Sequence, residues 1–312
     1  MKRFLKTKLS LICAFCLIIC MVGGFTSTAV PGGTDSADYS GSSTQDNSAL
    51  INISNIPSAG TQTYNGVSIY VNGIKVSDGI QVKGTTYILM KTFFDAIGVQ
   101  TNIAWDEKSN TATVTAQNLS MTATAGSSYF TANGRCFYLP QGVVGTGGSV
   151  ALPVSELAKV YQVVAKWDEA SSSYSIIADS PRPFASSASV YKEKDLYWLS
   201  HLINAEAGNQ PLKGKIAVGD VVMNRLTDPT CPKTVYNVIF DKKYGVQFSV
   251  TKNGGIYAEP NAESVAAAKI CLEGYDVVGS AIYFVNPRIA ETAWFSKTRT
   301  YVTTIGEHVF YS

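Results

Sequence analysis

An internal repeat between residues 64 and 179 restricts the fold of this 312-residue chain more than any other feature. Asn72-Gly73 recurs as Asn133-Gly134, and Trp105-Asp106 recurs as Trp167-Asp168. Asn-Gly is a preferred dipeptide of tight β-hairpin turns. Each copy is therefore predicted to hold strands around an Asn-Gly turn, a short helix, and a hairpin that turns after Trp-Asp. Two such copies predict one small α+β domain whose halves pack together.

Residues 191–312 show a different pattern, in which helices come first and strands come last. The predicted helices cover 195–210, 211–225, 234–240 and 263–272, and residues 244–255 are expected to form a loop. The predicted strands cover 281–285, 293–296, 301–305 and 306–311. This order indicates a second α+β domain.

A glutamate lies on the apolar face of the first of these helices. At 3.6 residues per turn, Leu196, Leu199, Leu202 and Ile203 share one face, and Glu206 follows on the same stripe. Partial burial raises the pKa of a carboxyl group, and so does the negative end of the helix dipole. A raised pKa suits a general acid at neutral pH. From the spacing alone, a snorkelling or salt-bridged glutamate near a helix end fits as well.

The remaining segments read as export and connecting sequences. Residues 1–29 hold a basic start, an apolar run and small residues before a cleavage point, as a secretory signal peptide does. An uncleaved membrane anchor is the alternative. Residues 30–62 are expected to form a disordered linker, and residues 180–190 a second linker, because both are rich in small and polar residues. The domains are thus placed at 63–179 and 191–312 of a secreted protein.

Charge and cysteine content exclude several classes of partner and cofactor. The first 29 residues carry four basic side chains and no acidic one, so 21 Lys and Arg face 23 Asp and Glu in the remainder. Such a near-neutral chain lacks the basic surface that nucleic acids require. No stable membrane partner is expected after signal cleavage. Because no CxxC pair lies outside the signal, we expect no structural zinc site and no other cofactor. Cys231 and Cys271 form either a disulfide or two buried thiols.

The repeat resembles the copper amine oxidase N-terminal-like domain of exported bacterial wall proteins. Residues 63–179 contain no histidine and only one cysteine, so an ordinary copper site is not expected there. The resemblance leaves two interpretations open. The domain is either an adaptor for a cell-wall or protein ligand, or a spacer without a ligand.

Five sequence blocks occur in order in the C-terminal domain. They are NAEAGNQP at 204–211, AVGDVVMNRL at 217–226, QF at 247–248, FVNP at 284–287 and TIGEHVFY at 304–311. Together they are similar to the SleB-type cell-wall hydrolases, the spore cortex-lytic enzymes of germination. The resemblance implies a lysozyme-like α+β catalytic domain that acts on peptidoglycan glycan strands in the cell wall or spore cortex. It also implies that Glu206 is the catalytic glutamate.

The same blocks supply weaker candidates for substrate binding. Aromatic rings can stack on sugars, and Gln or Asn side chains can bind acetamido groups. Ordinary core packing is the alternative for the aromatic residues, and a structural role is the alternative for the histidine. The candidates are Gln247, Phe248, Tyr283, Asn286, Trp294 and His308. Asn224 and Arg225 are expected to close their helix or to pair locally.

Three functional classes compete. A lytic transglycosylase needs only Glu206, whereas a two-carboxylate hydrolase needs a second acid. The available acids are Asp220, Glu259, Glu291 and Glu307. An N-acetylmuramoyl-L-alanine amidase of the zinc type needs about three protein ligands, but the chain holds only two histidines and no HExxH motif. A non-catalytic wall-binding protein is the third class. Cortex and vegetative wall are equally compatible substrates.

Overall fold

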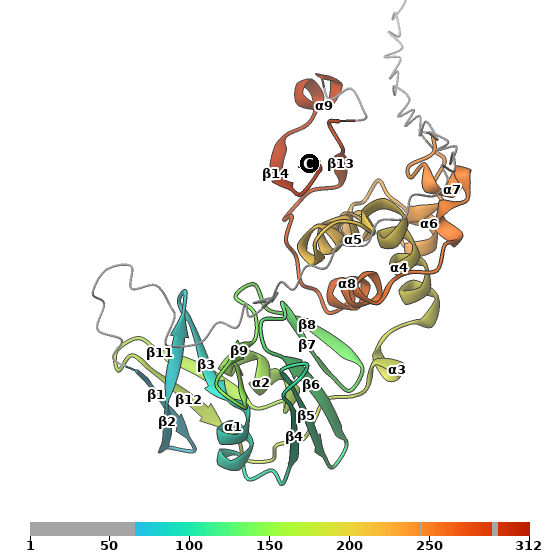
Figure 1. Ribbon diagram of the computed structural model, residues 1–312. Coiled ribbons are helices and arrows are strands. Elements are labelled where there is room, and N and C mark those ends of the chain that lie inside the picture. The colour runs from blue at the N-terminus through green and yellow to red at the C-terminus, as the bar shows by residue number, and fades with distance from the viewer. Residues whose placement is uncertain (1–65, 244, 289–292) are drawn as a thin grey trace, which may run out of the picture.

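The computed structural model of the chain describes residues 66–243, 245–288 and 293–312 (Figure 1). The predicted signal segment at 1–29 and the linker at 30–62 lie outside these residues, as does Glu291. A β-rich domain is followed by a helical domain that carries a small sheet at its far end. The predicted α+β class is confirmed for the chain. Within the described part of the chain, no helix has the length and apolar character needed to cross a membrane.

Two antiparallel-rich sheets build the N-terminal domain. A seven-stranded sheet has the order β11-β12-β1-β2-β3-β10-β9, and a five-stranded sheet has the order β4-β5-β6-β7-β8. The strands of the larger sheet are β1 (Val67–Val71), β2 (Ile74–Val82), β3 (Thr85–Leu89), β9 (Val144–Gly145), β10 (Val150–Pro153), β11 (Val164–Asp168) and β12 (Ser173–Ile177). The strands of the smaller sheet are β4 (Asn102–Asp106), β5 (Thr111–Ala116), β6 (Leu119–Thr124), β7 (Tyr129–Ala132) and β8 (Arg135–Tyr138).

The two copies of the repeat are interlocked. β3 of the first copy pairs with β10 of the second, with Ile88 opposite Leu152 and Leu89 opposite Ala151. In the repeat, Ile88 is equivalent to Ala151, and Leu89 is equivalent to Leu152. Exchanging the two copies therefore turns one of these pairs into the other, so the copies meet across a local twofold axis. The last hairpin of the second copy, β11–β12, then joins β1 of the first copy in a parallel pairing. The repeat is therefore one domain and not two units set side by side.

The predicted Asn-Gly turns join β1 to β2 and β7 to β8. Asn72 and Asn133 have φ of 49° and 48°, and the glycines that follow them also have positive φ. Positive φ at both central residues defines the hairpin turn for which Asn-Gly is selected. Helices α1 (Met90–Ala96) and α2 (Val154–Val160) contribute fully buried Phe93, Phe94 and Leu157 to the core.

The helical domain is built around α5 (Leu212–Thr227), which is buried on nearly every side. The other helices are α4 (Glu193–Ala207), α6 (Val235–Ile239), α7 (Val250–Asn253), the 3-10 turn η2 (Gly255–Tyr257) and α8 (Ala262–Leu272). Gly219 of α5 faces both neighbouring helices. A Cβ atom there would lie 2.5 Å from Cys271 Sγ of α8 and 2.9 Å from Ile203 Cδ1 of α4. The close packing of the three helices therefore requires glycine at this position.

Several local predictions were wrong. Residues 293–298 form helix α9 (Ala293–Thr298), where a strand was predicted over 293–296. The sheet consists of β13 (Tyr283–Val285), β15 (His308–Tyr311) and β14 (Tyr301–Ile305), in that order. A four-residue segment is too short for its periodicity to separate helix from strand. Helices α7 and η2 occupy part of the loop predicted over 244–255. Pro211, predicted to begin the second helix, precedes α5 as its N-cap. Cys231 and Cys271 are free thiols and form no disulfide with each other.

The segment at 180–190, expected as a linker, is packed against the β-rich domain. Phe184 is buried in that domain's core, and its N–H donates to Val160 O at 2.9 Å. Short helix α3 (Ser187–Val190) follows, and the Ser187 N–H donates to Asn133 O at 2.9 Å. These backbone hydrogen bonds fix the direction in which the chain enters α4.

Candidate active site

Glu206 lies in the last turn of α4, on its buried face. Leu199, Leu202 and Ile203 are fully buried on that face, as the apolar periodicity predicted. Ala207 ends the helix, and Gly208 caps it. A carboxyl group in this position lies near the negative end of the helix dipole, which disfavours its ionised form.

The environment of Glu206 keeps its side chain protonated up to neutral pH. Burial raises the pKa of Glu206 to about 7, because the charged form loses its hydration. Its Oε1 atom is buried and has no hydrogen-bond partner in the described part of the chain. No ion pair to Glu206 occurs among the described residues either, which argues against the salt-bridged alternative. A carboxyl group with a raised pKa and a buried, unsatisfied oxygen has the properties of a proton donor.

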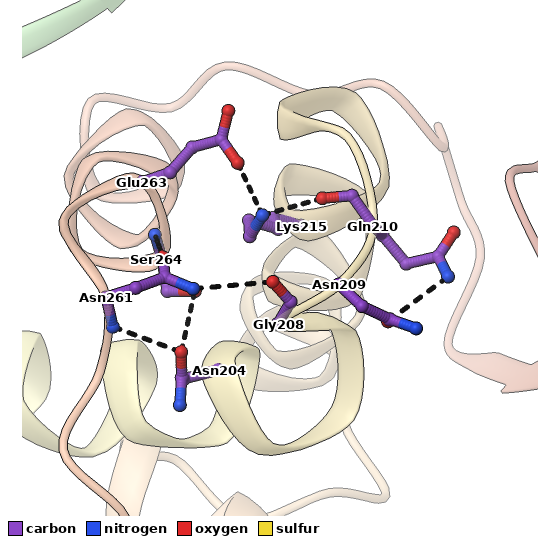
Figure 2. Close-up of polar contacts among 8 residues, drawn as sticks. All are labelled: Asn204, Gly208, Asn209, Gln210, Lys215, Asn261, Glu263 and Ser264. Atoms are coloured by element: carbon purple, nitrogen blue, oxygen red, sulfur yellow. Dashed lines mark hydrogen bonds and ion pairs between the residues drawn. The ribbon is translucent and has the colours of Figure 1, made fainter. Parts of the chain in front are cut away.

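A polar cluster joins the end of α4 to the start of α8 (Figure 2). Asn204 Oδ1 accepts from the Asn261 N–H at 3.1 Å and from Ser264 Oγ at 3.2 Å. Asn261 Nδ2 donates to Gly208 O at 3.3 Å, directly beyond the helix end. These contacts fix the last turn of α4, and therefore the backbone that carries Glu206. Neither Asn204 nor Asn261 was predicted from the sequence as a site residue, although Asn204 belongs to the same block as Glu206.

The loop after Glu206 is held by a buried lysine (Figure 2). Lys215 of α5 is 3% exposed, and its Nζ donates to Gln210 O at 2.6 Å and pairs with Glu263 of α8. The side chain of Gln210 reaches the small sheet, where its Oε1 accepts from the Glu307 N–H at 3.2 Å. The end of the α4 helix is thereby tied to α5, α8 and the β14–β15 turn.

Arg225 gathers three of the predicted binding residues. Its guanidinium donates to Gln247 Oε1 at 3.3 Å, and its carbon Cζ lies 5.2 Å from the Phe248 ring and 5.6 Å from the Tyr283 ring. Phe248 is 2% exposed and belongs to the core. It therefore has the core-packing role that was the alternative to sugar binding. Gln247 and Tyr283 are half-buried. Arg225 was expected to close its helix or to pair locally, and its observed partners lie on other segments of the chain.

The other predicted binding residues lie on the small sheet. Asn286 Nδ2 donates to Glu307 Oε2 at 3.4 Å, and Arg288 pairs with the same carboxylate at 2.7 Å. His308 is buried against Phe284, with ring centroids 5.1 Å apart, and burial lowers its pKa. Its Nδ1 atom is buried and has no hydrogen-bond partner among the described residues. The side chain of Trp294 lies outside what the structure describes.

The acids proposed as a second catalytic group lie in different environments. Asp220 is 2% exposed and accepts from the Val277 N–H at 2.8 Å, and burial raises its pKa to about 7. Glu307 is paired as described, and Glu259 is exposed. Only Glu206 among the described candidates combines burial with an unsatisfied oxygen.

The described residues contain no cluster of three His, Cys, Asp or Glu side chains that could hold a metal ion. His201 is buried, and its Nδ1 lies 2.9 Å from Ile256 O. Its hydrogen bond and burial are those of a structural histidine.

Comparisons with known proteins agree with the two resemblances. Residues 209–311 match the Cell Wall Hydrolase family model, and residues 66–176 match the copper amine oxidase N-terminal domain model. A spore cortex-lytic enzyme of Oceanobacillus iheyensis is 33% identical over 120 residues, which cover 38% of this chain and 42% of that protein. The corresponding enzyme of Bacillus subtilis is 31% identical over 38% of each chain. The match therefore spans less than half of these relatives.

Among solved structures, the catalytic domain of the germination-specific lytic transglycosylase SleB from Bacillus anthracis is similar to this chain. The two are 32% identical over 39% of this chain and 97% of that domain, with a TM-score of 0.36.

Proposed function

The C-terminal region of this chain is a cell wall hydrolase domain, and we propose that it cleaves peptidoglycan glycan strands with Glu206 as the general acid. The observation that carries this proposal is the unsatisfied Oε1 of Glu206 together with a pKa of about 7. At neutral pH a large fraction of this carboxyl is protonated. It can therefore protonate the oxygen of a glycosidic bond that enters the site.

The bond proposed for cleavage joins N-acetylmuramic acid to N-acetylglucosamine. Glu206 gives its proton to the glycosidic oxygen, and the bond between that oxygen and the anomeric carbon breaks. The 6-hydroxyl of the same muramic acid attacks the anomeric carbon, and the Glu206 carboxylate takes up the hydroxyl proton. The products are a 1,6-anhydromuramic end and a free N-acetylglucosamine hydroxyl. Because the attack is intramolecular, it benefits from proximity and consumes no water.

The surroundings of the other acids favour this transglycosylase route over two-carboxylate hydrolysis. Hydrolysis requires a second carboxyl about 5 Å or about 6.5–9.5 Å from the first. Asp220 is buried with a backbone partner, and Glu307 is paired with Arg288. Each of these carboxyl groups already has a partner, whereas Glu206 Oε1 has none among the described residues. The relatives named above, spore cortex-lytic enzymes and a lytic transglycosylase, support the same reaction.

We further propose that the protein acts outside the cell, on the cell wall or spore cortex, after cleavage of a signal at 1–29. The domain at 63–179 is proposed to act as an adaptor for a wall or protein ligand. Cortex and vegetative wall remain alternative substrates for the catalytic domain at 191–312.

Two other functions make different predictions. An amidase would separate the stem peptide from muramic acid and would lose activity with a chelator, because it depends on zinc. A non-catalytic binding protein would release no fragments. No observation in the structure favours either function over glycan cleavage.

The deciding experiment is mass spectrometry of fragments released from purified peptidoglycan by the full chain. We expect 1,6-anhydromuramic ends, no effect of a chelator, and no release by Glu206→Gln, which keeps the shape of the side chain but cannot donate the proton. Reducing muramic ends would reject the transglycosylase route. Near-normal release by Glu206→Gln would reject Glu206 as the acid.

A further inference from the structure

An exposed aromatic cluster covers the first half of α4, away from Glu206. Trp198 of α4 is half-buried at its centre. Around it lie Tyr197 of α4, Tyr236 of α6 and Tyr257 of η2, which are 46%, 47% and 63% exposed. Their ring centroids lie 4.9, 5.4 and 6.3 Å from that of Trp198. Three large exposed aromatic side chains in contact with one tryptophan are unusual on a surface without a ligand.

A second neighbouring ring supports two of these tyrosines. The Tyr197 ring lies 4.1 Å from the His201 ring at an interplanar angle of 33°. The Tyr236 ring lies 4.5 Å from the Phe240 ring at 32°. His201 is itself held by Ile256 O, so its ring cannot turn freely. Each tyrosine is therefore supported by a neighbouring ring, while about half of its surface stays open to solvent.

The chemistry of the cluster selects a neutral, amphipathic ligand. The four clustered aromatic residues and the two rings behind them, His201 and Phe240, include no Lys, Arg, Asp or Glu. Phosphates and anionic surfaces therefore find no counter-charge in the cluster. The hydroxyls of Tyr197, Tyr236 and Tyr257 make no hydrogen bonds within the described chain and are available at the rim of the rings. A pyranose ring has an apolar face and hydroxyl groups at its edge, which match an open aromatic face bordered by hydroxyls. Rigid rings also lose little conformational entropy on binding.

The cluster is separate from the catalytic position but lies on the same helix. Tyr197 precedes Glu206 by nine residues, which is about 13 Å along α4 and about half a turn around it. One sugar therefore cannot contact both groups.

We infer that this cluster of Tyr197, Trp198, Tyr236 and Tyr257 is a second glycan-binding site, which holds an uncharged stretch of sugar strand away from the bond being cleaved. The inference rests on the proposed function for its ligand, because the substrate proposed for Glu206 is a long sugar polymer. It adds a surface that recruits the polymer without contacting the reacting atoms.

Binding is tested with the full chain carrying Glu206→Gln, so that strands are not cut. The probe is a set of soluble N-acetylglucosamine oligomers, which carry no charge, titrated by calorimetry. Tyr197→Ala, Tyr236→Ala and Tyr257→Ala should each weaken binding about fivefold, as the loss of one aromatic contact predicts. Tyr197→Phe keeps the ring and should bind almost as well as the parent. Trp167→Ala removes a 43% exposed aromatic residue of β11 in the other domain and is the matched control.

A second measurement uses chains that retain Glu206. The alanine variants should release fragments from insoluble peptidoglycan more slowly and cleave a short soluble oligosaccharide at the wild-type rate. If the alanine variants bind strands as tightly as the parent, or if Trp167→Ala loses as much affinity, the inference is wrong. It is also wrong if the alanine variants lose only self-association in sedimentation velocity, because the cluster is then an interface between copies. If the wild-type chain releases no fragments but its binding still depends on these tyrosines, the proposed function is wrong and the second binding site is retained.

Discussion

Arg135 of β8 and Glu273, the residue after α8, form a two-point ion pair across the junction of the two domains. Nε lies 2.7 Å from Oε1, and Nη2 lies 2.5 Å from Oε2. The two side chains are only 17% and 5% exposed, and the Tyr191 hydroxyl donates to the same carboxylate. The planar guanidinium also lies 4.3 Å from the Phe184 ring. The β-rich domain is thus fixed to the helix whose other end holds Asn204.

Breaking this pair should destabilise the junction. Arg135→Met leaves the buried Glu273 carboxylate without its cation, and we expect the free energy of unfolding to fall by about 3 kcal/mol. The double variant with Glu273→Met should cost less than the sum of the two single variants, since no unpaired charge remains. Urea unfolding of the parent, both single variants and the double variant measures this coupling. Additive losses would show that the two side chains do not interact.

Activity should depend on the protonation of Glu206. Because its pKa is about 7 and the protonated form is the donor, kcat/KM should fall as pH rises through about 7. The measurement is a pH profile of fragment release by the full chain on soluble strands. If kcat/KM instead falls at acidic pH and stays full well above neutral pH, Glu206 is not the proton donor, because its ionised form would then have to begin the reaction.

Stability should show the same titration. The folded pKa of Glu206 is raised from 4.5 to about 7, so its contribution to stability is complete below the unfolded pKa and is lost as pH rises through about 7. Glu206→Gln cannot ionise and escapes this loss, which amounts to about 3 kcal/mol in the wild type. Unfolding at pH 4 and at pH 8 should therefore favour the variant at the higher pH only. If the free energies of unfolding of the two proteins differ by the same amount at both pH values, the pKa of Glu206 is not shifted on folding.

A substitution of Asp220 tests whether this buried carboxyl group is structural or catalytic. Its carboxylate accepts from the Val277 N–H, and an asparagine oxygen can accept the same bond. We expect Asp220→Asn to release fragments at the wild-type rate. A loss of activity as large as that of Glu206→Gln, with an unchanged melting temperature, would instead mark Asp220 as the second acid of a hydrolase.

Gly219 tests the packing of the helices behind the site. Gly219→Ala places a methyl group against Cys271 Sγ and Ile203 Cδ1, and overpacking of this kind costs about 1–3 kcal/mol. Cys271→Ala removes the sulfur and makes room, so the double variant should recover part of the loss. Thermal unfolding of the three variants measures this recovery. If the double variant is less stable than either single variant, another contact must limit the space.

The helical periodicity of α4 was enough to place Glu206 on the buried face, because a period of 3.6 residues is a local property of the chain. The Asn-Gly turns were equally predictable, since Asn and Gly are the residues that tolerate the positive φ this turn requires. The segment at 293–298 was not predictable, because four residues carry too little periodicity to distinguish a strand from a helix.

The tertiary structure decided which side chains meet. Arg225, expected from the sequence to close its helix or to pair locally, contacts Gln247, Phe248 and Tyr283 only because α5 packs against the segments that carry them. The partnership of Arg135 with Glu273 joins residues far apart in the chain, and no local pattern marks it. The pKa of Glu206 likewise depends on the burial of its carboxyl group by distant segments. Local patterns thus determined the Asn-Gly turns and the place of Glu206 on its helix, whereas contacts between distant residues set the charge state, the partners and the domain junction.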